Sequence, residues 1–199
     1  METNKTQNTN HKNKQPKIKK EHDQKKSATL KQEEKTKQTK QRKYPKPSVP
    51  RNASPMKSLK EVQEYLEDLA ETFRQLSAED KLHLLIELGK DAPEFPKQFE
   101  LPENRVPGCI SDAYFIVSEQ EGTLFFQGVA KAAISQGFVA ILLNCCNGLS
   151  KEDFEHIDPL FESFLQQSQV NASMVPSRAN AFSNMFTFMK TIAKKIVKQ

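Results

Sequence analysis

Residues 113–127 contain two apolar runs, Ala113-Tyr-Phe-Ile-Val117 and Thr123-Leu-Phe-Phe-Gln127, on either side of Gly122. Aromatic and β-branched residues dominate both runs, and a glycine between two such runs is typical of a β-hairpin. We therefore expect two short antiparallel strands joined by a loop of a few residues. The segments on both sides have the spacing of helices, so the sequence predicts an α+β fold with helices packed around a small antiparallel β-sheet.

Before the predicted hairpin, the sequence indicates two helices. Ser58 and Glu61 have the spacing of a capping box, in which the hydroxyl and the carboxylate satisfy free amides of the first turn. Ser77 is expected to begin the second helix, and Gly89 to end it in the left-handed conformation. Apolar residues recur at helical spacing in the first helix, at Val62, Leu66, Leu69, Phe73 and Leu76.

After the hairpin, residues 130–144 form a strongly apolar run that stops before Asn147-Gly148 and predicts a buried helix. Ser150 and Pro159 are expected to begin two shorter helices. Ser177 is expected to cap a last helix, whose apolar residues are Phe182, Met185, Phe186, Met189, Ile192 and Ile196.

Composition divides the chain near Met56. Residues 1–56 hold 16 of the 30 Lys and Arg against five acidic residues, a formal charge of +11, whereas the remainder carries −6. All 13 Phe lie in the remainder, so the first part has too little apolar surface to offset the entropy of ordering. We expect residues 1–56 to be a disordered Lys/Gln/Thr-rich arm with a Pro-rich linker, and residues 57–199 to be one folded domain. The arm is either a nonspecific polyanion-binding tail or a solvating extension.

Several classes of protein are excluded by the same inspection. No apolar run approaches the roughly 20 residues that span a bilayer, and the N-terminus lacks the apolar core of a secretory signal. Glu21, Asp23, Glu33 and Glu34 argue against a mitochondrial transit peptide. Three cysteines, two of them adjacent, make no disulfide framework, so we expect a cytoplasmic protein and no contact with a membrane.

Cys109 is the residue most suited to chemistry. It directly follows Pro107-Gly108, at the end of residues 91–108. Four prolines in that segment exclude a regular helix there. A thiol presented on such a loop reacts as its thiolate, which a nearby cation favours. Arg105 and, through the fold, Arg178 are the candidate cations. The alternative is that Cys109 is a small buried apolar residue.

The other reactive side chains favour structural roles. Cys145 and Cys146 end an apolar helix, so we expect them to pack in the core. No histidine lies at metal-ligand spacing from them, and no phosphate-binding or dinucleotide motif occurs, so we expect neither a metal site nor a bound cofactor. A Cys–His hydrolase would need His83 or His156 to meet Cys109 through the fold, which nothing in the sequence indicates.

Residues 57–197 resemble the SufE-type sulfur-acceptor proteins of iron–sulfur cluster assembly. The resemblance rests on Leu85-Ile-Glu-Leu-Gly89 followed by Pro93, on the loop Asn104-Arg-Val-Pro-Gly-Cys-Ile-Ser111, on Phe126-Gln-Gly128 and on Pro176-Ser-Arg178. Two positions depart from the family pattern. Tyr114 stands where the family commonly has tryptophan, and Lys131 stands in a segment that is acidic in the family.

The resemblance implies a function and its site. Cys109 would accept sulfur as a persulfide from a SufS-like cysteine desulfurase, stimulate that enzyme and deliver the sulfur to an iron–sulfur scaffold of SufB type, while Arg178 supports the thiol. The pyridoxal phosphate belongs to the desulfurase, so the protein is a sulfur-transfer accessory protein rather than a stand-alone enzyme. A homodimer is a further arrangement that this resemblance leaves open.

Two other functions remain as alternatives. An IscU-like scaffold, similar in overall fold, would assemble the cluster itself and would bring three cysteines together as ligands. A nucleic-acid-binding protein would act through the basic arm, although the rest of the chain is acidic.

Overall fold

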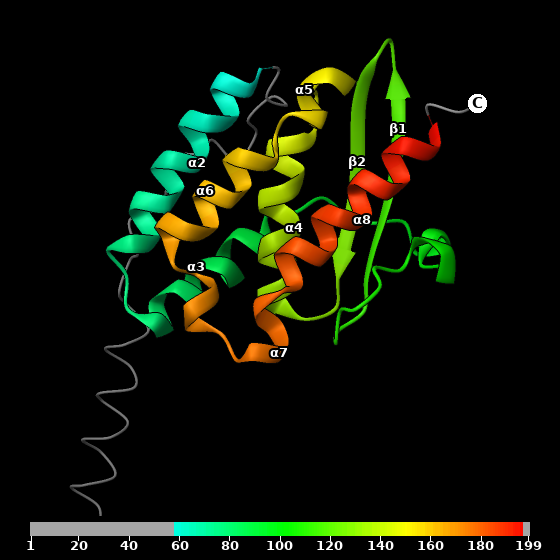
Figure 1. Cartoon of the computed structure of the whole chain (residues 1–199). Helices are drawn as coiled ribbons and strands as arrows, with labels where there is room; N and C mark the ends of the chain where they lie inside the picture. Colours follow the sequence, from blue (N-terminus) through cyan, green and yellow to red (C-terminus); the bar gives the residue numbers. More distant parts are fainter. Residues whose placement is uncertain (1–57, 197–199) are drawn as a thin grey trace, which may run out of the picture. The chain divides into compact units, whose positions relative to one another are not determined.

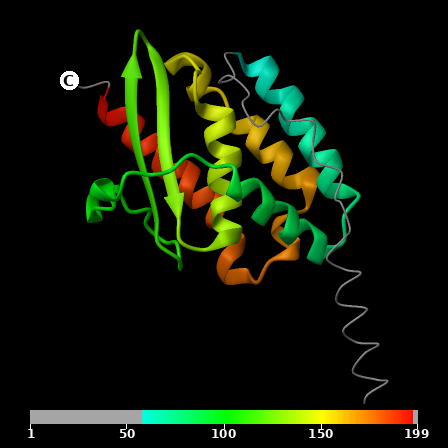
Figure 2. The same cartoon turned by 180° about the vertical axis from the view of Figure 1, so that it is seen from behind.

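The computed structural model describes residues 58–196, so the predicted arm, residues 1–56, lies outside the described residues. Figures 1 and 2 show two helices, a hairpin and a further set of helices in chain order. The elements before the hairpin are α2 (Leu59–Arg74), α3 (Ala78–Lys90) and the 3₁₀ turns η1 (Lys97–Phe99) and η2 (Pro102–Asn104). The hairpin is β1 (Ala113–Gln120) and β2 (Thr123–Ala130). After it come α4 (Ala133–Cys146), α5 (Lys151–Glu155), α6 (Asp158–Ser168), η3 (Asn171–Ser173), α7 (Pro176–Ala179) and α8 (Ala181–Ile196).

The hairpin confirms the prediction from the two apolar runs. β1 and β2 pair antiparallel, from Ala113 opposite Ala130 to Gln120 opposite Thr123. Only Glu121 and Gly122 lie between the strands, with φ of 50° and 80°. Two successive residues with positive φ match the right-handed twist of the strands, which is why this turn forms where the sequence places a glycine.

The core lies where α4 passes between the hairpin and the other helices. α4 packs against α3, β2 and α8, and α8 also crosses β1 (Figure 1). Phenylalanine rings fill the space beneath α8, with Phe161 centred 4.7 Å from Phe186 and 5.2 Å from Phe182, both edge-on. Edge-to-face contacts of this kind add to the apolar burial that stabilises the domain. The structure therefore confirms the α+β fold.

The predicted helix starts are confirmed at three serines. Ser58 Oγ accepts a hydrogen bond from the Glu61 N–H at 3.3 Å and donates to the Glu61 carboxylate at 2.8 Å. Ser77 and Ser150 cap α3 and α5 in the same way, each accepting from the N–H three residues ahead. The prediction that Ser177 caps the last helix is wrong, because Ser177 lies within α7. Pro176, with its fixed φ, begins that separate turn, and α8 starts only after Asn180.

Gly89 also differs from its predicted role. It lies within α3, which continues to Lys90, and it is not among the glycines with positive φ. Instead α3 and α4 cross at this point. A Cβ on Gly89 would lie 2.9 Å from the Gly137 nitrogen, and one on Gly137 would lie 2.2 Å from the Leu85 carbonyl oxygen. The two glycines are needed because the helix backbones approach each other too closely for a side chain.

Candidate functional site

Cys109 lies on a loop that is tied at its base. The Val106 N–H donates to the Ala113 carbonyl at 2.8 Å, and Arg105 forms a β-bridge with Tyr114. Gly108, directly before the cysteine, has a φ of 73°, a conformation that residues with a side chain rarely adopt. The loop therefore turns sharply next to the thiol, which is partly exposed.

Three contacts hold the loop in place beyond its base. The Arg105 guanidinium donates through Nε to Asp112 Oδ1 at 2.7 Å, across the neck of the loop. Asn184 Nδ2 on α8 donates to the Gly108 carbonyl oxygen at 3.1 Å. The hydroxyls of Ser111 and of Ser135 on α4 lie 3.3 Å apart, within hydrogen-bond distance. The thiol is thus presented by a loop that is attached to two helices.

Electrostatics at Cys109 has opposing causes. Partial burial raises the pKa of the Cys109 thiol above its usual value. The positive charge of Arg105 and a hydrogen bond from the Asn184 side chain both lower this pKa and so oppose the effect of burial. Burial has the largest effect, so the pKa stays above its usual value, and the two neighbours limit the loss of the thiolate, which is the nucleophile.

The two candidate cations lie in different places. Arg105 is on the same loop as Cys109, and its charge acts on the thiol. Arg178 lies on α7 with an exposed side chain, for which the structure gives no hydrogen bond or ion pair among residues 58–196. Figures 1 and 2 show α7 and the loop that leads into β1 at the same end of the described domain. Arg105 is thus the cation whose charge acts on the thiol. Arg178 lies at the same end of the domain as the Cys109 loop.

Asn184 is the site residue that the sequence analysis missed. It lies in the first turn of α8 between the buried residues Phe182 and Met185. An amide at this position of an apolar helix is a weak signal, because the sequence does not show what its side chain contacts. Its partner, the Gly108 carbonyl, is 76 residues away in sequence and is visible only in the fold.

Cys145 and Cys146 are core residues, as predicted. Both side chains have 0% exposure, and burial raises the pKa of each thiol well above its usual value. Ser135, on α4, contacts the Cys109 loop, and Cys145 lies ten residues further along the same helix. At the rise of an α-helix, this separates Cys145 from the loop contact by about 15 Å. The three thiols therefore do not converge as ligands of one cluster, which disfavours the IscU-like scaffold. Among residues 58–196, no three His, Cys, Asp or Glu side chains are grouped so as to hold a metal ion.

The two departures from the family pattern lie next to the loop. The Lys131 ammonium donates to both carboxylate oxygens of Glu100 at 2.6 Å, and its main-chain N–H donates to the Asp112 carbonyl at 2.9 Å. Lys131 therefore joins the proline-containing segment to the end of the Cys109 loop. Tyr114, through its bridge to Arg105, is part of the base of the same loop.

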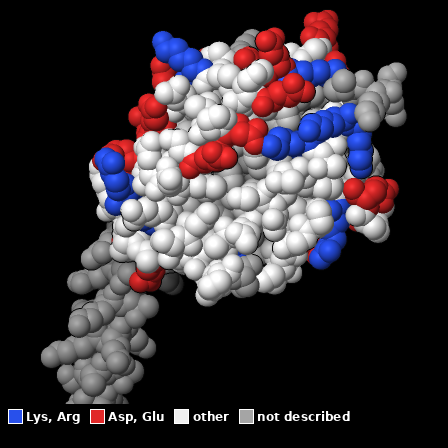
Figure 3. All heavy atoms as spheres, in the orientation of Figure 1, with Lys and Arg blue, Asp and Glu red and all other residues white. Residues whose placement is uncertain are grey.

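Exposed apolar side chains occur on this same part of the molecule. Among the described residues, the large apolar side chains with high exposure are Ile110 (66%), Val175 (56%) and Leu101 (41%). Ile110 follows Cys109 directly, and Val175 precedes α7. In Figure 3, charged side chains are sparse over α7 and the first turns of α8. The exposed Ile110 side chain beside the thiol is available for contact with another protein.

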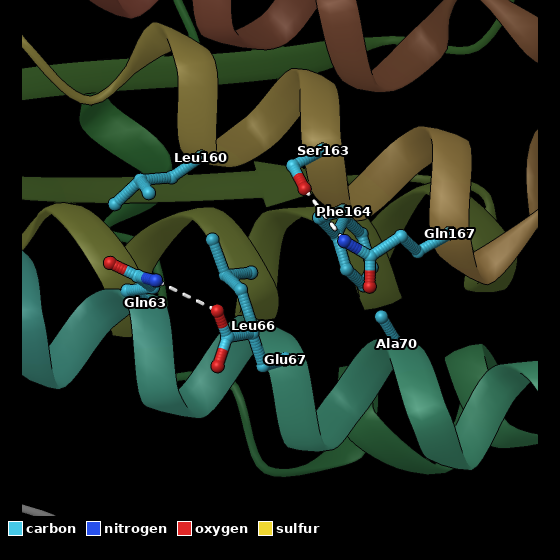
Figure 4. A pocket seen from close by; sticks show the side chains of 8 residues that line it. All are labelled: Gln63, Leu66, Glu67, Ala70, Leu160, Ser163, Phe164 and Gln167. Atoms are coloured by element: carbon cyan, nitrogen blue, oxygen red, sulfur yellow. Dashed lines mark hydrogen bonds between the residues drawn. The ribbon is translucent and has the colours of Figure 1, made fainter.

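Two cavities lie away from Cys109. The first, of about 50 Å³, lies between α2 and α6, where Gln63 donates to Glu67 and Gln167 to Ser163, both at 2.8 Å (Figure 4). The second, of about 330 Å³, has Leu124 and Phe154 among its lining residues, together with both acidic and basic groups. Neither is lined by residues of the Cys109 loop. No helix between residues 58 and 196 has the length and apolarity needed to cross a bilayer.

Comparison with known proteins gives the family of this chain. The model of the SufE family, described as an Fe–S metabolism associated domain, matches residues 67–193. The chain belongs to the SufE family. An uncharacterized SufE-like protein of Synechocystis sp. is 30% identical over 120 residues, which are 60% of this chain and 74% of that protein. An uncharacterized SufE-like protein of Rhizobium meliloti is also 30% identical over 120 residues, 58% of this chain and 84% of that protein.

The fold of the SufE domain has a counterpart among solved structures. The solution structure of a hypothetical protein from Thermus thermophilus matches with a TM-score of 0.54 at 19% identity, over 67% of this chain and 96% of that chain. Membership of the family assigns the protein to Fe–S metabolism, in a sulfur-transfer role, and associates it with a cysteine desulfurase partner.

Proposed function

We propose that the protein is a persulfide carrier, in which Cys109 accepts sulfur from a SufS-like cysteine desulfurase and stimulates that enzyme. The observation that carries the proposal is the placement of Cys109. It is the partly exposed thiol of the three, on a tied loop, with the Arg105 charge and the Asn184 amide opposing the rise in its pKa that burial causes. The buried thiols of Cys145 and Cys146 have neither access to solvent nor such neighbours to oppose the effect of burial on the pKa.

The transfer step is a thiolate exchange without net oxidation. The Cys109 thiolate attacks the outer sulfur of the desulfurase persulfide, a new S–S bond forms at Cys109, and the S–S bond of the desulfurase breaks. The proton stays on the outer sulfur, and the desulfurase cysteine leaves as a thiolate. The products are a Cys109 persulfide and a desulfurase that is ready for the next turnover.

The partners follow from the surface and from the chemistry. The exposed side chain of Ile110, next to Cys109 in sequence, gives the desulfurase an apolar contact at the reacting thiol, and the exposed Val175 precedes α7 at the same end of the domain. The persulfide then passes to an iron–sulfur scaffold of SufB type. Pyridoxal phosphate is the cofactor of the desulfurase, so this chain needs none of its own. We place the reaction in the cytoplasm, where free thiols stay reduced.

The test is to locate the transferred sulfur. The protein is incubated with a SufS-like desulfurase and free cysteine, and mass spectrometry of the peptides follows each of the three cysteines. We expect added sulfur on the peptide of Cys109, and the same result for the matched control Cys145→Ala/Cys146→Ala. Sulfur found on Cys145 or Cys146 instead, or on none of the three, would overturn the proposal.

We further propose that residues 57–199 carry both the fold and the sulfur-transfer activity. Among the described residues, the buried core extends from Val62 to Ala193. A protein lacking residues 1–56 is expected to melt cooperatively within a few degrees of the full chain and to accept sulfur at the same rate. A drop of many degrees would show that the arm docks on the domain and that the boundary is wrong.

A further inference from the structure

Asn184 connects the last helix to the peptide that precedes the reactive cysteine. Its side chain is partly buried in the first turn of α8, where its neighbours Phe182, Met185 and Phe186 are buried. Asparagine is a poor residue for a helix interior, so the helix itself gains little from it. What the residue does instead is donate from Nδ2 to the Gly108 carbonyl oxygen at 3.1 Å.

The conformation of Gly108 makes this contact specific. With a φ of 73°, the glycine turns its carbonyl towards α8, and a Cβ added there would lie 3.1 Å from Asn184 Nδ2. The amide and the glycine are therefore matched in shape as well as by the hydrogen bond. Since the carbonyl of Gly108 belongs to the peptide group that carries the Cys109 nitrogen, holding it restrains the main chain from which the thiol leaves the loop.

Building on the proposed function, we propose that Asn184 is the positioning residue of the sulfur-transfer site. Its amide holds the Gly108–Cys109 peptide against α8 and so aims the sulfur at the incoming persulfide. The role requires a donor at this place. A side chain of the same shape that only accepts hydrogen bonds would turn the peptide away.

The electrostatics of the thiol supports the same role. The Asn184 side chain lowers the pKa of Cys109 by a hydrogen bond, alongside the Arg105 charge and against burial. The titratable groups that bear on the thiol among the described residues are on its own loop and on β1. Arg105 acts on it directly, while Asp112 and Tyr114 act on that guanidinium. From α4, the contact to the loop is the uncharged Ser135, and α7 carries the exposed Arg178.

The experiment measures the thiol itself in the full-length protein. Alkylation by iodoacetamide is followed between pH 6 and pH 10, and mass spectrometry of peptides assigns the rate to Cys109. For Asn184→Ala we expect alkylation at pH 7.5 about threefold slower or more, with the profile shifted to higher pH. For Asn184→Asp, which keeps the shape but adds a negative charge, we expect about a tenfold loss. Thr187→Ala, at an exposed residue in the next turn of α8, is the matched control and is expected to leave the profile unchanged.

The rescue variant separates positioning from simple packing. Asn184→Gln retains an amide donor on a longer side chain, so it is expected to react faster than Asn184→Ala at every pH below 9. Equal profiles for the natural protein, Asn184→Ala and Asn184→Asp would overturn the proposal. If Asn184→Ala fails to fold, which thermal unfolding detects, the near-isosteric Asn184→Asp alone decides by the same criterion.

The two proposals fail in different ways. Alkylation uses no desulfurase, so a shifted profile in a protein that accepts no sulfur would overturn persulfide transfer but leave the positioning role standing. Sulfur acceptance by Cys109 with an unshifted Asn184→Ala profile would overturn only the positioning role.

Discussion

Cys109 and the pair Cys145–Cys146 carry the same chemical group in opposite surroundings. Cys109 is partly exposed beside a guanidinium and an amide donor, whereas the pair is fully buried at the end of α4. Burial raises the pKa in all three, but charged or hydrogen-bonding neighbours oppose it only at Cys109. The difference lies in the contacts of each thiol, since the residue type alone is equally consistent with a packing role and with a reactive one.

The largest expected effect separates the two regions completely. Cys109→Ser should abolish sulfur acceptance and stimulation of the desulfurase, because a serine hydroxyl is a poor nucleophile and forms no persulfide. The melting temperature should stay within a few degrees, since the loop is held by backbone and polar contacts rather than by sulfur. Desulfurase turnover with increasing amounts of the variant, together with a thermal melt, checks both statements. A Cys109→Ser variant that still carries sulfur would show that Cys109 is not the acceptor.

Substitution of the buried pair should affect stability instead of sulfur transfer. Cys145→Ser/Cys146→Ser leaves buried hydroxyls in an apolar environment, which costs about 1–3 kcal/mol for each hydroxyl that finds no partner. Urea denaturation gives the free energy of unfolding, and the same persulfide assay gives the transfer. We expect lower stability with transfer retained by the folded protein. Unchanged stability with lost transfer would show that Cys145 and Cys146 serve in the transfer rather than in the core.

The buried pair also predicts a pH dependence of stability. In the folded protein the pKa of both thiols lies well above the usual 9.0, so the unfolded chain releases these protons first as the pH rises. Stability is therefore expected to be constant below about pH 8 and to fall above pH 9, by up to about 1.4 kcal/mol per pH unit for each thiol. Urea denaturation at pH 8, 9 and 10 measures it. Cys145→Ala/Cys146→Ala should show a shallower decrease, and an equally steep one would show that the two thiols are not its cause.

The smallest expected effects concern the two arginines. Arg105→Gln removes the charge that acts on Cys109, so the thiol should alkylate about threefold more slowly at neutral pH. Arg178→Ala should give a graded decrease in sulfur acceptance with little change in alkylation, because its side chain lies at the same end without a described contact to the thiol. A full loss of transfer in Arg178→Ala would give this residue a larger share in the reaction than the geometry supports.

Local features of the structure could be predicted from the sequence. The hairpin at Gly122, the caps at Ser58, Ser77 and Ser150, and the buried Cys145 each depend on neighbours within a few residues. Short-range hydrogen bonds and alternating or helical apolar spacing determine such features. Cys109 could be singled out in the same way, because Pro107-Gly108 marks a turn in the sequence itself.

Features that depend on contacts between distant segments could not be predicted. Gly89 has the position of a helix end, but its role is set by the backbone of α4 and becomes visible only when the two helices cross. Asn184 is an ordinary polar residue until α8 is placed beside Gly108. The prediction for Ser177 is wrong for a local reason, since Pro176 begins a turn of its own before the last helix. The loop could thus be predicted as reactive, but not the group that holds it.

The turn at Glu121 and Gly122 offers a place to observe the encounter with a partner. It lies at the far end of the hairpin from Cys109, since the seven residue-to-residue steps from Ala113 to Gln120 span about 23 Å. The exposed Gln120 therefore suits a fluorescent label on Gln120→Cys, with Cys109 protected during labelling. Energy transfer from this label to one on the desulfurase would then report docking at the opposite end of the hairpin. The reacting thiol of Cys109 would stay unmodified.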